Sequence, residues 1–561
     1  MSNSKSKADV KYVGFFLAHK FSFVYYFFMI TFDSLTLKAF IEENREFLTG
    51  ARIQRIQQPT RRDFVLTIRG FDKDSRAETR KLYININPQL HHICFMSKEN
   101  EEKRLIEIPQ KPPMFCMLLR KYLENARICK VNQPPYERIF ELYIETFNEL
   151  SEKIHLCLAI ELMGKHSNVV LYNDDTNVII GCAHNVGAEK SREREMAGTL
   201  PYVYPPKQNK IDILNYNGEI NFDKLNSEFY WFSKTFASQV KGATLTELQD
   251  YVCLKGLQPA ISKDYKEYSL FSELLLERIE QKNVNTMLDN YYAYYIEKDK
   301  FRALKTNLTT IANQKLRRDK MSLAKMQIQI GKEENGGKYR LYGDLIMANL
   351  YQLKDFSSQI EVYDYENNQN IIIELDETKS LKDNANRFYK LYTKSKTSIE
   401  KLTELSQNLS AEIAYYEQIL YSIDIATGMK DLLEIKSELL PEKEKKDKKN
   451  TSNLPIEFEV EGQKVFVGRN NRQNDYIVSK LSIDEDYWFH IKDGAGSHVL
   501  LKVSEPSDKL IYECAKLAKE YSTAKMSTKA GVIYTKRKYL KKPPKANLGY
   551  VTYKFEKEIV V

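Results

Sequence analysis

The sequence has few cysteines, and their arrangement suits neither a disulfide framework nor a zinc finger. The seven are odd in number, widely spread and never spaced as Cys-x-x-Cys. Disulfide scaffolds need an even, clustered set, and structural zinc needs closely spaced ligand pairs. We therefore expect a reducing, cytoplasmic environment. The seven are Cys94, Cys116, Cys129, Cys157, Cys182, Cys253 and Cys514.

The sequence also lacks the motifs of the common hydrolases. There is no Gly-rich GxxxxGK[ST] loop, no GxSxG and no HExxH, which argues against an autonomous NTPase, serine hydrolase or zincin. Four histidines, His91, His92, His166 and His184, have no Cys, His or carboxylate companions at ligand spacing. We therefore predict no metal site at these histidines.

No uninterrupted apolar run is long enough to suggest a membrane span. Residues 13–32 are apolar and aromatic, but His19 and Lys20 interrupt them and no small-residue cleavage site follows. A more ordinary sequence opens at Met29. We leave residues 1–28 unplaced as an extension, and we expect no contact with membranes.

Proline is absent from all 180 residues between 261 and 440. Helices exclude proline from their interiors, so two long helices are expected here. Each shows an apolar seam at steps of three and four, which predicts an antiparallel coiled-coil arm over 283–440. Glycines and two strand-like runs between the helices predict a small module at about 336–380. The seams comprise Phe301, Leu304, Leu308 and Ile311 in the first helix, and Leu402, Leu405, Leu409, Ile413, Tyr416 and Leu420 in the second.

The length of 561 residues implies several domains. The predicted fold class is α+β multidomain, with a mixed α/β domain over 29–215. In it the runs 63–70, 81–87, 140–147 and 167–173 read as strands, and 113–126 as a helix. Two prolines at 205–206 mark the end of this domain. Four further segments are expected after it: a helix-hairpin-helix-like segment at 216–282, the arm at 283–440, a charged linker at 441–453 and an α+β RNA-binding domain at 454–561.

Positive charge gathers near the C-terminus. The net charge is +9, and between Lys509 and Lys545 eleven Lys or Arg face only two Glu. Such a stretch attracts phosphate backbones, although a solvated lysine-rich surface would have the same composition.

The most informative string runs from 467 to 503, VGRNNRQNDYIVSKLSIDEDYWFHIKDGAGSHVLLKV. Its first part crowds planar hydrogen-bonding side chains together, and its second part places aromatic and histidine rings on a strand and turn. This set can grip phosphate and stack on a base; the alternative is a polar turn followed by ordinary core aromatics. The candidate RNA-binding residues here are Arg469, Asn470, Asn471, Arg472, Asn474, Trp488, His490, Lys492, Ser497 and His498, joined further on by Lys536, Arg537 and Lys538.

This string resembles the C-terminal signature of the RqcH/NEMF (NFACT) family of ribosome-associated quality control, labelled fibronectin-binding protein A in some bacteria. The segments 111–126, 161–173, 338–351 and 384–396 agree with the family in the same order. The resemblance implies a factor, monomeric on the ribosome, that binds the large ribosomal subunit holding an obstructed peptidyl-tRNA and contacts ribosomal RNA. It implies that the factor makes no bond itself, so we expect no catalytic residue, no cofactor and no enzyme activity. It would recruit charged tRNA, in bacteria alanyl-tRNA, so that the ribosome itself adds a C-terminal tail.

The resemblance also points to residues in the first domain. The family's Asp-Arg pair, tied to tRNA recruitment and tailing, corresponds to Glu137-Arg138, where the acid is one methylene longer. An acidic residue near the family's N-terminus corresponds to Asp33, for which capping the following helix is an equal alternative. In the signature, Ala495 stands where the family commonly has proline.

Two other functions remain open from the sequence. One is a fibronectin-binding surface adhesin, for which the only support is the apolar run at 13–32. The other is a nucleic-acid binder like the DNA-repair glycosylases, whose N-terminal domain the family is thought to resemble. Those enzymes use an N-terminal Pro-Glu and a zinc finger, and both are missing here.

Overall fold

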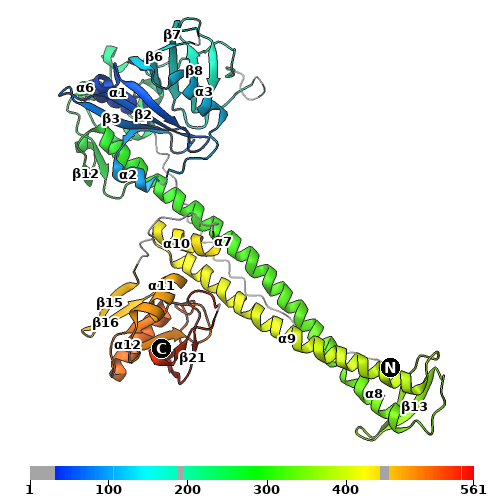
Figure 1. Ribbon diagram of the computed structural model, residues 1–561. Coiled ribbons are helices and arrows are strands. Elements are labelled where there is room, and N and C mark those ends of the chain that lie inside the picture. The colour runs from blue at the N-terminus through cyan, green and yellow to red at the C-terminus, as the bar shows by residue number, and fades with distance from the viewer. Residues whose placement is uncertain are drawn as a thin grey trace, which may run out of the picture. The chain divides into compact units, whose positions relative to one another are not determined.

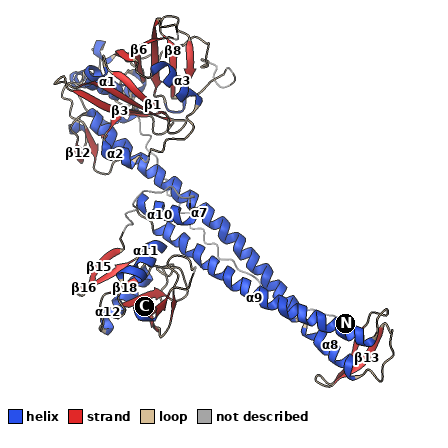
Figure 2. Ribbon diagram, viewed as in Figure 1, coloured by secondary structure: helices blue, strands red, loops and turns tan. Residues whose placement is uncertain are grey.

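The structure is a computed structural model that describes residues 32–104, 106–148, 150–187, 189, 194–441, 454–544 and 546–561. The chain forms two compact units, residues 1–298 and 299–561. The 1–28 extension and nearly all of the expected 441–453 linker lie outside the described residues. Figure 1 labels the elements, and Figure 2 shows which of them are helices and strands.

The first unit is built on one antiparallel sheet of nine strands in the order β4-β3-β2-β1-β5-β6-β7-β8-β9. Two consecutive meanders meet at β1 and β5, where the register pairs Arg52 with Arg127. All four predicted strands and the predicted helix are present. The strands are β1 (Arg52–Gln57), β2 (Asp63–Phe71), β3 (Ala77–Asn85), β4 (His92–Met96), β5 (Arg127–Asn132), β6 (Ile139–Phe147), β7 (Lys153–Glu161), β8 (Asn168–Asn173) and β9 (Ile179–Cys182); the helices are α1 (Ser34–Leu48), α2 (Lys98–Lys103) and α3 (Met114–Leu123).

The two meanders repeat one another locally. Each follows a helix whose end is turned by a residue in the left-handed region, Gly50 with φ 86° after α1 and Asn125 with φ 67° after α3. Each then enters a strand with the same pattern, ARIQRI at 51–56 and ARICKV at 126–131, and each strand is bulged at the same place. The loop after β5 is thus the counterpart of the loop after β1.

Short helices and a small sheet follow the nine strands. The turn between α5 and α6 contains Gly242 at φ 90°, and α6 begins with a capping box between Thr244 and Glu247. The hydrophobic side chains of this segment join the core of the large sheet. The elements are α4 (Leu225–Glu228), α5 (Lys234–Gln239), α6 (Leu245–Val252), β10 (Ala260–Ser262), β11 (Tyr268–Ser269) and β12 (Arg278–Glu280).

The first long helix, α7 (Val284–Glu334), is anchored in the first unit by a buried ion pair. Arg104 is fully buried and its Nη1 donates to Asp289 Oδ1 at 2.5 Å. The other carboxylate oxygen of Asp289 accepts the Asn100 side-chain amide at 2.8 Å. Two charges removed from water persist only when they are paired and hydrogen-bonded, so this contact fixes the root of the helix.

In the second unit α7 packs against α9 (Leu381–Ile425) as an antiparallel pair. The seam near the base buries Leu308 and Ile419 completely, as the apolar spacing predicts. Leu405, also expected in the seam, is 51% exposed. A further helix, α10 (Met429–Leu439), turns back after Gly428 and adds Leu432 to the same core; the sequence analysis placed no separate helix here.

A small module joins the far ends of α7 and α9, as predicted (Figure 1). It consists of α8 (Gly337–Ala348) and the hairpin of β13 (Gln359–Asp364) and β14 (Gln369–Glu374). Ile346 and Ile373 are fully buried between the hairpin and the helices.

The C-terminal domain has an antiparallel sheet of six strands in the order β15-β16-β18-β17-β19-β22. The amphipathic helix α12 packs on it and buries Cys514 and Ala515. The elements are β15 (Ile456–Val460), β16 (Gln463–Val467), α11 (Asn471–Tyr476), β17 (Tyr487–Ile491), β18 (Val499–Leu501), α12 (Asp508–Glu520), β19 (Gly531–Lys536), β20 (Leu540–Lys541), β21 (Thr552–Tyr553) and β22 (Lys557–Val560).

Candidate functional site

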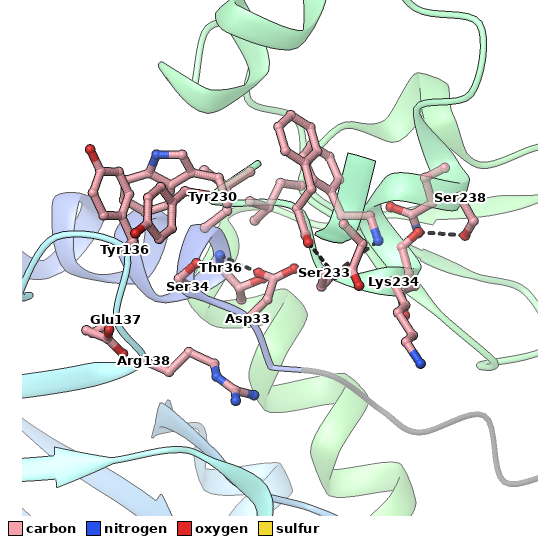
Figure 3. Close-up of a pocket in the computed structure, with 18 of the residues that line it drawn as sticks. Asp33, Ser34, Thr36, Tyr136, Glu137, Arg138, Tyr230, Ser233, Lys234 and Ser238 are labelled. Atoms are coloured by element: carbon pink, nitrogen blue, oxygen red, sulfur yellow. Dashed lines mark hydrogen bonds between the residues drawn. The ribbon is translucent and has the colours of Figure 1, made fainter. Parts of the chain in front are cut away.

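The first unit contains a cavity of about 800 Å³ between the start of α1, the β5–β6 loop and the short helices that follow the sheet. Its size is in the range of small-molecule and nucleotide pockets. The three residues that the sequence analysis singled out in this domain, Asp33, Glu137 and Arg138, all line it (Figure 3). Residues more than a hundred positions apart therefore meet at one site.

Asp33 acts as the helix cap that was one of its two expected roles. Its Oδ1 accepts the Thr36 backbone N–H at 2.8 Å, which satisfies a donor at the start of α1. Its Oδ2 accepts the Ser233 hydroxyl at 2.7 Å, and Ser233 in turn caps α5 through the Phe236 N–H. One carboxylate thus joins the two helix starts that form the cavity wall.

Arg138 presents an unsatisfied guanidinium to the cavity. Among the described residues no hydrogen bond or ion pair of this side chain is found. Burial lowers the pKa of Arg138, and the carboxylates of Asp33 and Glu137 oppose that shift. Burial likewise raises the pKa of Glu137, opposed by Arg138. The charges of Glu137 and Arg138 are therefore partly removed from water. At such a site, a charge-assisted hydrogen bond to a ligand group of opposite charge is stronger than it would be in water.

Aromatic rings form the opposite wall, and the backbone that carries them is strained. Tyr136 and Tyr230 stack with ring centroids 3.9 Å apart and planes 12° from parallel, and Trp231 meets Tyr136 edge-on at 5.3 Å. Tyr136 and Trp231 have φ values of 67° and 74°, which are unusual for bulky residues. A hydrogen bond of 3.0 Å from the Tyr136 hydroxyl to Asp212 holds this ring in place.

The cavity therefore combines aromatic faces with positive charge. Besides Arg138, the ammonium groups of Lys210 and Lys234 line it, and Lys210 is fixed by a 2.7 Å hydrogen bond to the Asn226 carbonyl. Stacking faces beside cations suit an unstacked base and its phosphate. The aromatic wall was not predicted from the sequence, although the run YWFS at 230–233 stands out in a polar stretch.

The signature of the C-terminal domain lies largely inside the protein. Six of the proposed RNA-binding residues are buried, namely Asn470, Asn471, Asn474, Trp488, Ser497 and His498. The Trp488 ring stacks on His490 and meets His498 edge-on, and burial lowers the pKa of both histidines. Asn474 accepts the His498 N–H at 3.0 Å and so joins the two parts of the signature. Their role in RNA binding stays a prediction.

The amide and guanidinium groups of the signature face α10. Arg469 lies 3.2 Å from Asp431, and the Asn471 amide donates to Glu438 at 2.9 Å. Burial raises the pKa of Glu438, and the hydrogen bond from Asn471 opposes that shift. Arg472 is half-buried near this junction.

The remaining proposed RNA-binding cations lie closer to solvent, each beside a carboxylate. Lys536 and Lys538 share Glu485 at 2.5 and 2.8 Å, and together they lower the pKa of Glu485 to about 2. The other two are Lys492, 2.6 Å from Glu558, and Arg537, 3.7 Å from Asp484. Exposed ion pairs of this kind are weak, so these cations can leave their carboxylates to bind a phosphate.

Within the described ranges, no three His, Cys, Asp or Glu side chains are grouped to hold a metal ion. Over those ranges, no helix has both the length and the apolar character to cross a bilayer.

The fold defines a multidomain protein with a helical arm and a C-terminal α+β domain. Family models match nearly all of it: "NFACT N-terminal and middle domains" over 33–245 and 243–453, and "NFACT protein RNA binding domain" over 456–554. The chain belongs to the NFACT family, as the sequence resemblance predicts.

Two curated relatives match along nearly their whole length. The chain is 29% identical over 571 residues to "Rqc2 homolog RqcH" of Bacillus subtilis, covering 95% of this chain and 98% of the relative. It is 28% identical over 556 residues to the protein of the same name in Streptococcus pneumoniae, with the same coverage. Among solved structures, the N-terminal part of a Streptococcus suis protein titled "fibronectin/fibrinogen-binding protein" matches at 24% identity and a TM-score of 0.41, covering 47% of this chain and 99% of that one.

Proposed function

We propose that the chain is a factor of ribosome-associated quality control. It binds the large ribosomal subunit that holds an obstructed peptidyl-tRNA, contacts ribosomal RNA, and recruits charged tRNA, alanyl-tRNA, for C-terminal tailing of the stalled chain. The proposal is supported by membership of the NFACT family and by relatives named RqcH that match 95% of the chain. Tailing marks the product for degradation.

The observation that supports tRNA recruitment is the state of the Arg138 guanidinium. It lies half-buried in a cavity with a stacked aromatic wall, and no partner for it is found among the described residues. A guanidinium fork binds phosphate or a base edge in two places at once, and the rings offer a face to a base. Burial shifts the pKa of Glu137 up and that of Arg138 down, and the charge of each residue opposes the shift of the other and so favours the ionised pair.

The protein in this proposal performs no bond chemistry. Peptide bonds are made by the ribosome, and the chain positions the substrates as a cytoplasmic monomer. Two RNA-binding sites on one chain raise each other's effective concentration on a particle that presents both ligands.

The test compares Arg138→Ala with Arg55→Ala, which removes an exposed arginine from β1 outside the cavity. Losing charge-assisted hydrogen bonds of about 1.5–3 kcal/mol weakens tRNA binding roughly tenfold to a hundredfold. We expect Arg138→Ala to lose co-purified tRNA and tailing while still sedimenting with large subunits, and Arg55→Ala to retain all three. Sequencing the co-purified RNA identifies the tRNA.

Equal tRNA yields from the two variants would contradict the role of Arg138. Random RNA in place of one tRNA would contradict selective recruitment. The adhesin alternative is supported only by the apolar run at 13–32, nearly all of which lies outside the described residues. Cell fractionation separates the two functions, because an adhesin would be found outside the cell and absent from ribosomal particles.

A further inference from the structure

The C-terminal domain contacts the base of the arm through one row of polar pairs. Asp431, Glu434 and Glu438 recur at steps of three and four on α10, so their carboxylates lie on one face of the helix. Each faces one of three consecutive residues of the signature. The pairs are Arg469–Asp431 at 3.2 Å, Asn470–Glu434 at 2.8 Å and Asn471–Glu438 at 2.9 Å.

A second contact fixes the other part of the signature to α9. The Gln418 side chain donates to the Gly496 carbonyl at 2.9 Å and accepts the Gly496 N–H at 2.8 Å. A Cβ at Gly496 would stand 2.9 Å from the Ser522 Cβ, so glycine is needed at this position by the close approach of Ser522 within the C-terminal domain itself. Both halves of the signature are therefore held by the arm.

No apolar core spans this junction in the described residues. The core of the arm base and the two cores of the C-terminal domain contain no residue in common and draw on separate segments. Buried polar atoms at or beside the junction, Arg469 Nε, Gln473 Nε2 and Ser422 Oγ, have no hydrogen-bond partner among the described residues. Because unpaired buried polar groups cost free energy, a junction of this composition is held weakly compared with a domain core.

Carboxylates and phosphates compete for the same donors. A guanidinium and two side-chain amides that bind three carboxylates present the chemistry that an RNA backbone would require. The face of the signature is therefore occupied by an acidic surface of its own chain.

We propose that α10 is an internal competitor of RNA, and that the C-terminal domain leaves the three carboxylates when its signature binds the phosphate backbone. This inference rests on RNA binding by the C-terminal domain, which is part of the proposed function. Docked chains bind RNA weakly, and RNA that displaces α10 shifts the population to the released form. The apparent affinity is the intrinsic affinity reduced by the fraction of released chains.

The experiment uses the full chain with Arg138→Ala, so that binding in the cavity of the first unit is weakened equally in every chain compared. The release variant adds Glu434→Ala and Glu438→Ala, which removes two acceptors and leaves the signature amides unpaired when docked. The matched control adds Glu400→Ala and Glu404→Ala, which makes the same charge change at exposed positions of α9. The probe is fluorescently labelled bulk tRNA, and anisotropy gives the affinity.

We expect the release variant to bind the probe at least about fivefold more tightly than the control, as removal of a docked population predicts. Its affinity should also fall more steeply with salt, because more phosphates are engaged. In the parent chain, adding RNA should increase amide hydrogen exchange in α10, while strands β17 and β19 stay protected and show that the domain remains folded.

Equal affinities of release variant and control would overturn the proposal. So would RNA binding that leaves the exchange of α10 unchanged, because the signature would then stay docked and RNA would bind another face. Neither result bears on the cavity of the first unit, because every chain compared carries the same Arg138→Ala substitution there.

Discussion

At the scale of single residues, the cations differ in whether a carboxylate of the protein already binds them, and this decides how readily they can bind a phosphate. Lys536 and Lys538 lie against Glu485, and Arg469 lies against Asp431. Arg138 has two carboxylates near enough to shift its pKa but no hydrogen bond among the described residues. A half-buried charge without hydrogen bonds is costly, and binding a ligand removes that cost.

The same local charge acts on His91, which is 4% exposed beside the cavity. Burial, then the positive charge of Arg138, lowers the pKa of His91 to about 4. A folded-state pKa below the unfolded value of 6.5 favours the neutral ring, so this contribution to stability is present above pH 6.5 and is lost as the pH falls toward 4. Between pH 7 and pH 5 the loss is about 2 kcal/mol.

The measurement is denaturant unfolding at pH 7 and pH 5 of the chain with and without His91→Gln. The fluorescence of Trp231 reports the first unit when Trp488→Phe is present in both chains. The parent should lose about 2 kcal/mol more than the variant over this interval. An equal loss in the two chains would mean that His91 is solvated and titrates normally.

At the scale of elements, the sequence predicts what local patterns determine. Alternation located β2 and β6, and the proline-free stretch located α7 and α9, because side-chain period and helix propensity are local properties. The internal repeat could have been read from ARIQRI and ARICKV, and it marks the β5–β6 loop as a counterpart of the β1–β2 loop.

Other features depend on contacts between distant segments. The signature was predicted from composition to face RNA, but the structure buries Asn470 and Asn471 against α10, which begins only after Gly428. Gly428 is a single glycine inside a helical pattern, and this signal was too weak to predict the turn between α9 and α10. The cavity likewise needs the start of α1 beside the β5–β6 loop, which no local pattern encodes, and only the family resemblance brought Asp33 and Arg138 together.

The root of α7 gives a prediction at this scale. Asp289→Ala leaves the Arg104 guanidinium buried with its main partner removed, which should cost about 3–5 kcal/mol. Arg104→Met with Asp289→Leu replaces both charges by apolar side chains and should recover most of that loss. Unfolding of the first unit, again followed by Trp231, measures both. A cost below about 1 kcal/mol for Asp289→Ala would show that water reaches the pair.

At the scale of the molecule, the second unit carries contacts at both ends of its helix pair. The C-terminal domain docks near the base through Gln418, and the module of α8, β13 and β14 lies at the far end. Near that end α9 has a shallow groove of about 1220 Å³ lined by basic and hydroxyl side chains. They include Lys379, Arg387, Lys390, Lys394, Lys401, Thr393, Thr397 and Ser398. If the tip contacts the ribosome, the length of the arm sets where it does so.

Two contacts give the register for shortening the arm without changing its seam: Lys320 meets Glu417 at 2.6 Å, and Glu333 accepts the Ser395 hydroxyl at 2.6 Å. Residues 323–329 and 404–410 therefore lie opposite one another. Deleting both segments removes one heptad from each helix, shortens the pair by about 10 Å and rotates its end only slightly.

For this shortened chain we expect weaker binding to large subunits and unchanged binding of free tRNA, measured by sedimentation and anisotropy. Alanine substitution of the exposed residues in the same two segments keeps the length and should leave subunit binding intact. Full subunit binding by the shortened chain would show that the tip makes no contact whose position matters.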